Sequence, residues 1–156
     1  MRALVLLIMF LGLSAAVAAD RPNIILILAD DQGWNALSTR MHPDIPGSGS
    51  TYYQTPRLAQ LAKEGMRFSQ AYAPAPTCSP TRYAIQFGRS PSSLQIWGAD
   101  NIGKNVDAAV TDSLANRLKK ANPDYVCAHL GKWHIEWEPS ELGYDVAEYG
   151  DGHDPN

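Results

Sequence analysis

The chain has 156 residues, of which 45% are hydrophobic and 19% charged, and its 13 basic and 16 acidic side chains give a net charge of −3. This composition is typical of a globular domain and excludes a disordered, collagen-like or disulfide-dense chain. The mildly acidic balance, without a block of Lys or Arg, argues against nucleic acid as a partner.

The first 19 residues have the pattern of a secretory signal peptide. Arg2 precedes an apolar run over 3–13, and small residues follow over 14–19. A spanning helix needs about 20 apolar residues, so we expect cleavage near residue 19 and no stable membrane span. The predicted location is therefore outside the cytoplasm: periplasmic, secreted or in a secretory lumen. A buried first helix or strand is the alternative.

The chain then alternates predicted strands and helices. The apolar run over 23–28 predicts a strand buried on both faces, and a long loop follows over 35–54. Thr55 as N-cap and Pro56 as the first helical residue predict a helix that ends at Gly65 and buries an apolar stripe.

The second half continues this alternation. We predict a strand over 66–73, a short helix over about 80–87 and loop over 90–110. A helix capped by Thr111, with Leu114 and Leu118 inward, and a strand over 125–130 come next, and no closing element is expected from 139 onward. The pattern indicates an α/β fold with a mostly parallel sheet flanked by helices.

Two adjacent carboxylates, Asp30 and Asp31, follow the first predicted strand. Ligands of open α/β sheets bind beyond the carboxyl ends of strands, and calcium or magnesium takes oxygen ligands of this kind. The pair therefore indicates a candidate metal site, with a solvated turn as the alternative.

A second candidate site is Cys78-Ser79-Pro80-Thr81-Arg82, at the start of a predicted helix. Helix N-termini bind anions and lower the pKa of a cysteine, and Arg82 one turn along can hold an oxyanion. The segment therefore predicts a nucleophile beside an anion site. In an exported protein, a disulfide between Cys78 and Cys127 is the alternative.

The third candidate is the pair Lys132 and His134, which follows a predicted strand. Two residues apart on an extended segment, they are expected on the same side. Lys can neutralise an anion and His can transfer a proton near neutral pH, while an exposed strand end is the alternative. The three candidates together fit an active site for an anionic ester at one edge of the sheet.

Together these residues resemble the type I sulfatase family of the alkaline-phosphatase-like superfamily. The resemblance runs from Arg21 to about Asp145. Its motifs are the Cys-x-Pro-Ser/Thr-Arg element at Cys78–Arg82, the Gly-Arg pair at Gly88-Arg89, the Gly-Lys-Trp-His element at Gly131–His134, and the first strand, metal pair and helix over 21–33 and 55–68.

The resemblance implies an alkaline-phosphatase-like fold and the hydrolysis of sulfate esters, on a small molecule or a carbohydrate. In the family, the motif cysteine is oxidised to formylglycine, whose hydrated aldehyde attacks sulfur, expels the alcohol and then releases sulfate. Carried over, Cys78 would be the formylglycine precursor, the nucleophile and a metal ligand. A formylglycine-generating or sulfatase-maturing enzyme would be a partner.

The resemblance implies roles for the other candidates as well. Asp30 and Asp31 would ligate calcium, in preference to magnesium. Arg82 would stabilise the hydrated aldehyde, Lys132 would contact the sulfate, and His134 would assist proton transfer at the nucleophile. These roles agree with a metal acting as Lewis acid and with cations placed against developing charge.

The chain also departs from the family pattern. Tyr83 and Gln86-Phe87 replace small and aliphatic residues, which is expected to alter helix packing behind the site. Family members are much longer, so we expect 20–156 to be the truncated N-terminal part of a catalytic domain, with an incomplete sheet, poorly soluble and inactive alone. A phosphonate or phosphate monoester hydrolase and a non-catalytic fragment are the alternatives.

Overall fold

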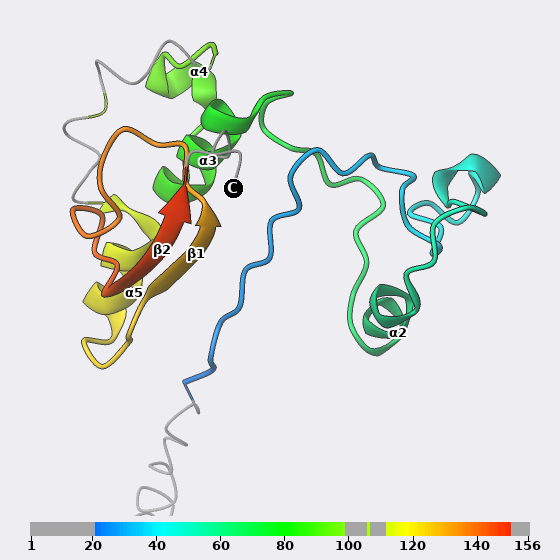
Figure 1. The fold of residues 1–156 in the computed structure, drawn as a ribbon, viewed down its shortest axis with the longest axis horizontal. Coiled ribbons are helices and arrows are strands. Elements are labelled where there is room, and N and C mark those ends of the chain that lie inside the picture. Colours follow the sequence, from blue (N-terminus) through cyan, green and yellow to red (C-terminus); the bar gives the residue numbers. More distant parts are fainter. Residues whose placement is uncertain (1–20, 99–105, 107–111, 151–156) are drawn as a thin grey trace, which may run out of the picture. The chain divides into compact units, whose positions relative to one another are not determined.

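The computed structural model describes residues 21–98, 106 and 112–150 (Figure 1). The predicted signal peptide at 1–19 and the predicted cap Thr111 lie outside the described residues. Within the described ranges, no helix is both long and apolar enough to cross a membrane. The chain divides into two units, Met1–Asp31 and Gln32–Asn156.

The predicted strand at 23–28 is extended chain in the structure. Residues 21–31, all of which are described, form no strand, and Ile25 and Ile27 are 84% and 82% exposed. The prediction of a strand buried on both faces is therefore wrong here. The physical reason is that a strand satisfies its backbone groups only through a neighbouring strand.

The predicted long loop contains one short 3-10 helix, η1 (Pro46–Ser48). Helix α2 (Pro56–Glu64) begins at the predicted proline and ends before Gly65. Its apolar stripe is exposed, with Leu61 61% accessible, so the predicted burial is wrong. Thr55 makes no capping bond, and its hydroxyl instead lies 2.9 Å from that of Ser38.

The predicted strand at 66–73 is also absent from this described stretch, and Met66 and Tyr72 are 79% and 82% exposed. Helix α3 (Cys78–Phe87) follows, starting two residues before the predicted boundary. Gly88 ends it in the left-handed conformation, with φ of 60°, which glycine adopts without strain. Helix α4 (Pro91–Leu94) then lies within the predicted loop.

Helix α5 (Leu114–Ala121) is capped by Ser113, whose hydroxyl accepts a hydrogen bond from the Asn116 amide at 3.2 Å. Ala115 is its buried residue, whereas the predicted inward residues Leu114 and Leu118 are half-buried. The helix ends at Ala121 with Asn122 as its C-cap, and Asn122-Pro123 stops it as predicted.

Two parallel strands, β1 (Ala128–Lys132) and β2 (Val146–Gly150), form the sheet of the described residues and lie side by side in Figure 1. Strand β1 is the predicted third strand shifted toward the C-terminus, and the expectation of no element after 139 is wrong, because β2 lies there. The parallel pairing agrees with the predicted sheet type.

The core lies around α3, which packs against α4 and α5. Aromatic and aliphatic side chains from α3, α4, the residues after them and the β1–β2 connection fill it, with Trp137 and Tyr144 packed at its border. Its fully or nearly buried members are Tyr83, Phe87, Leu94, Ile96, Val106, Trp133, Ile135 and Leu142.

Candidate functional site

Cys78 is the first residue of α3 and is half-buried. The extended backbone of Thr77 precedes it, so the first amides of the helix are at this end. The Thr81 hydroxyl donates to the carbonyl of Ala75 at 3.0 Å and ties the first turn to the proline-rich segment before it. The predicted placement of Cys78 at the start of a helix is confirmed.

Arg82 joins this helix to the second motif. Its side chain is 9% exposed, and its Nη1 donates a hydrogen bond to the main-chain carbonyl of Lys132, 50 residues along the chain. A guanidinium stays charged and carries five N–H donors in a plane, which suits it to bonds with carbonyl and anionic oxygens. The structure therefore brings together Arg82 and the end of β1.

The residues after β1 are less regular than the sequence suggested. Lys132 ends the strand and is half-buried, but His134 has φ of 55°, in the left-handed region that is uncommon outside glycine. The two residues therefore do not share one extended segment, and the prediction that they do is wrong. The residues on either side of His134, Lys132 and Glu136, are bonded to α3 through Arg82 and Tyr83.

Asp30 and Asp31 end the first unit, and both are exposed. Asp31 has a left-handed backbone, with φ of 55°. Carboxylate oxygens are suitable donors for calcium or magnesium, so the residue types fit the predicted ion. Among the described residues, no group of three or more His, Cys, Asp or Glu side chains is gathered as for a metal, and the roles of the pair stay predictions.

The residues that depart from the family pattern join α3 to the β1–β2 connection. The Tyr83 hydroxyl accepts a hydrogen bond from the Glu136 amide at 3.1 Å, and the Tyr144 hydroxyl donates to Gln86 Oε1 at 2.9 Å. The rings of Tyr83 and Phe87 lie 5.9 and 6.2 Å from that of Trp137. Burial raises the pKa of Tyr83 to about 12, so its hydroxyl is neutral at ordinary pH.

His129 in β1 was missed by the sequence analysis. Its ring packs edge-on against Trp133 and Tyr144, with centroids 4.6 and 5.8 Å apart. Burial lowers the pKa of this histidine, and nearby backbone carbonyl groups oppose that shift. The aromatic neighbours in the connection are the only sequence signal that could have pointed to it.

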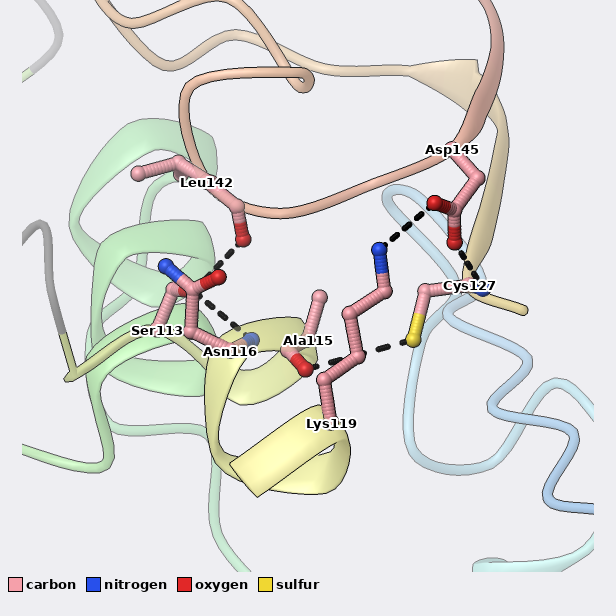
Figure 2. A network of polar contacts seen from close by, with 7 residues as sticks. All are labelled: Ser113, Ala115, Asn116, Lys119, Cys127, Leu142 and Asp145. Atoms are coloured by element: carbon pink, nitrogen blue, oxygen red, sulfur yellow. Dashed lines mark hydrogen bonds and ion pairs between the residues drawn. The ribbon is translucent and has the colours of Figure 1, made fainter. Parts of the chain in front are cut away.

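A polar network connects α5 to the start of β2 (Figure 2). Ser113 donates to the Leu142 carbonyl at 2.6 Å, and Lys119 pairs with Asp145 at 2.6 Å. Asp145 also accepts from the Cys127 amide at 2.8 Å, and the Lys119 bond and this amide hold the pKa of Asp145 below its usual value. The network fixes the end of the connection that leads into β2.

Both cysteines are free thiols, Cys78 half-buried and Cys127 buried. The Cys127 sulfur faces the Ala115 carbonyl at 4.0 Å, within the network of Figure 2. The structure therefore does not contain the disulfide weighed as an alternative.

Comparisons with known proteins agree with the motifs. The family model for sulfatases matches residues 22–154. N-acetylgalactosamine-6-sulfatase of Mus musculus is 34% identical over 155 residues, covering 91% of this chain and 28% of that protein. Arylsulfatase A of Homo sapiens is 34% identical over 128 residues, covering 81% of this chain and 24% of that protein.

A solved structure described as the crystal structure of Ps i-CgsB is also similar. It aligns with a TM-score of 0.64 and 33% identity, over 83% of this chain and 28% of that chain. The chain thus spans about a quarter of the length of the curated relatives it matches. Its fold class is the expected α/β, alkaline-phosphatase-like one, of which it contains a part. The chain belongs to the sulfatase family.

Proposed function

We propose that residues 20–156 are the N-terminal part of a sulfatase catalytic domain that hydrolyses sulfate esters of small molecules or carbohydrates. The observation that carries the proposal is the hydrogen bond from Arg82 to the Lys132 carbonyl. It joins the helix that starts at Cys78 to the segment of Lys132 and His134. Two family-like motifs far apart in sequence are thus neighbours, as a shared site requires.

The charges near this junction suit an anionic ester. Arg82 and Lys132 are cations, and the first amides of α3 are donors that favour an anion. In the proposed reaction, these groups stabilise negative charge on the sulfate oxygens. The His134 imidazole takes up or gives back the proton of the nucleophile.

Two groups beyond the twenty amino acids belong to the proposal. Cys78 is the residue that a formylglycine-generating or sulfatase-maturing enzyme would oxidise, and its half-buried place at the start of α3 leaves it partly accessible. Asp30 and Asp31 would hold calcium through carboxylate oxygens. When present, formylglycine supplies the nucleophile and calcium supplies a Lewis acid.

The proposal includes export and dependence on the rest of the enzyme. The pattern of residues 1–19 supports a signal peptide and a periplasmic, secreted or secretory-lumen location. Consecutive exposed apolar residues at 24–28 support poor solubility of the chain by itself. We expect residues 1–156 alone to release little sulfate, and robust release by the purified chain would refute this part.

The decisive experiment is mass spectrometry of the peptide that contains Cys78. The chain is expressed with a competent formylglycine-generating enzyme, and we expect an aldehyde at Cys78 while the Cys127 peptide keeps its thiol. An Arg82→Ala variant, which alters the motif but keeps Cys78, is expressed and measured in the same way for comparison. An unmodified Cys78 thiol under these conditions would contradict the proposal.

A second measurement separates the sulfatase from a phosphate or phosphonate monoester hydrolase. The protein that contains this chain together with the remaining catalytic domain is assayed with an aryl sulfate and with the matching aryl phosphate. We expect faster turnover of the sulfate. Preference for the phosphate would favour the other hydrolase class.

A further inference from the structure

One face of α3 is bonded at three successive places to the end of β1 and to the connection that leads to β2. The first contact is near the end of β1, the second follows His134, and the third lies just before β2. The pairs are Arg82 with the Lys132 carbonyl, Tyr83 with the Glu136 amide, and Gln86 with the Tyr144 hydroxyl.

The middle contact is made by the most buried of the three α3 side chains. Tyr83 is fully buried, and its ring contacts those of Phe87 and Trp137. Trp133 Nε1 donates to the Trp137 carbonyl at 2.6 Å, so the connection is also fastened to itself. The ring packing and this bond hold the Tyr83 hydroxyl in place on the side that meets the Glu136 amide.

The backbone near this contact needs outside support. His134 is a non-glycine residue in the left-handed region, a conformation that persists when the surrounding structure holds it. The bond from the Glu136 amide to Tyr83 lies two residues farther along. It anchors the turn on one side, and the Arg82 bond to Lys132 anchors it on the other.

We propose that Tyr83 is a positioning residue whose hydroxyl, by holding the Glu136 amide, fixes the turn that carries Lys132 and His134 against the helix of Cys78. The inference rests on the proposed function, because it assigns a purpose to the placement of those two side chains. Tyr83 itself does not touch the substrate in this proposal.

The test is hydrogen exchange by mass spectrometry on dilute full-length chain, comparing the wild type with Tyr83→Phe. The variant keeps the ring and removes only the hydroxyl acceptor. We expect amide exchange in the peptide spanning 133–138 to rise about fivefold, the effect of losing one ordinary hydrogen bond. Exchange in α5 should stay unchanged.

Chemical labelling measures the accessibility of the His134 side chain directly. We expect diethylpyrocarbonate to modify His134 faster in Tyr83→Phe than in the wild type, while the rate at His42, in the segment before α2, is unchanged. Tyr144→Phe, which removes the third contact, should affect His134 less. Tyr52→Phe, at a tyrosine that is 84% exposed, is the control, and it should change neither the exchange rate at 133–138 nor the labelling rate of His134.

Two results would overturn the inference. One is an unchanged exchange rate at 133–138 together with unchanged His134 labelling in Tyr83→Phe. The other is a uniform rise that includes α5, since that would show a general loss of stability in place of a local one. Neither hydrogen exchange nor His134 labelling depends on sulfate release or on conversion of Cys78. A failure of this inference can therefore be told from a failure of the proposed function, which the Cys78 aldehyde assay tests.

Discussion

The buried hydrophobic side chains of the described residues all lie between Tyr83 and Leu142, whereas the large apolar side chains at 24–28 and 58–72 are exposed. Tyr83 and Leu142 have no exposed surface, but Ile25 is 84% and Phe68 66% exposed. Both stretches contain apolar patterns that predict burial. The difference shows that patterned apolar side chains are buried only where this chain also supplies the surface against which they pack.

Helices and strands differ in how they respond to a missing partner. Helix α2 forms although its apolar stripe is exposed, because helical hydrogen bonds are local and Gln60 adds a bond to Glu64 at 2.8 Å. The apolar run at 23–28 forms no strand, because strand hydrogen bonds need a second strand. Local signals were therefore enough for α2 and insufficient for 23–28.

The largest contrast is expected from truncating one apolar side chain in each stretch. Phe87→Ala removes a buried ring from the core and should lower the free energy of unfolding by about 3–5 kcal/mol. Leu61→Ala removes an exposed side chain and should change it by less than about 0.5 kcal/mol. Urea unfolding followed by tryptophan fluorescence measures both, and equal effects would contradict the comparison.

Two glycines provide the next contrast. A Cβ at Gly143 would lie 2.1 Å from Asn116 Oδ1, and φ there is 89°, so Gly143→Ala should cost about 1–3 kcal/mol. A Cβ at Gly47 would meet nothing within 4 Å, which makes Gly47→Ala the matched control. The midpoint of thermal unfolding should fall for the first variant only. A wild-type midpoint for Gly143→Ala would show that Asn116 in α5 moves aside at little cost in stability.

Helix capping gives a smaller difference. Ser113→Ala removes both the cap of α5 and the bond to the Leu142 carbonyl, with an expected loss of about 1–2 kcal/mol. Thr55→Ala precedes α2 but removes no cap, so its effect should be smaller. Chemical unfolding of the two variants decides the order. The reverse order would mean that Thr55 supports α2 in another way.

The pH dependence of Asp145 is the smallest expected effect. Its pKa is lowered in the folded chain, first by Lys119, so the carboxylate stabilises the fold above its unfolded pKa and loses this effect as pH falls through the folded pKa. Asp145→Asn should therefore be less stable than the wild type at neutral pH, and the difference should shrink as the pH falls through the folded pKa of Asp145. A difference that is independent of pH would reject the ion pair as its cause.

The parts of the site that could be predicted are those with local signals. The start of a helix at Cys78 follows from its proline and neighbouring residues, and the end of α5 follows from Pro123. The bond between Tyr83 and Glu136 joins residues 53 apart, and no local pattern encodes it. Strand β2 was missed because all five of its residues are exposed, which leaves no apolar alternation to read.

The two free thiols have a practical consequence for following the maturation of the chain. Cys127 is buried, and burial raises the pKa of its thiol, so alkylating reagents should reach it slowly in the folded state. Cys78 is half-buried and should react first. The fast phase of thiol alkylation therefore counts unconverted chains, and its loss on co-expression with the modifying enzyme would measure the converted fraction without any substrate.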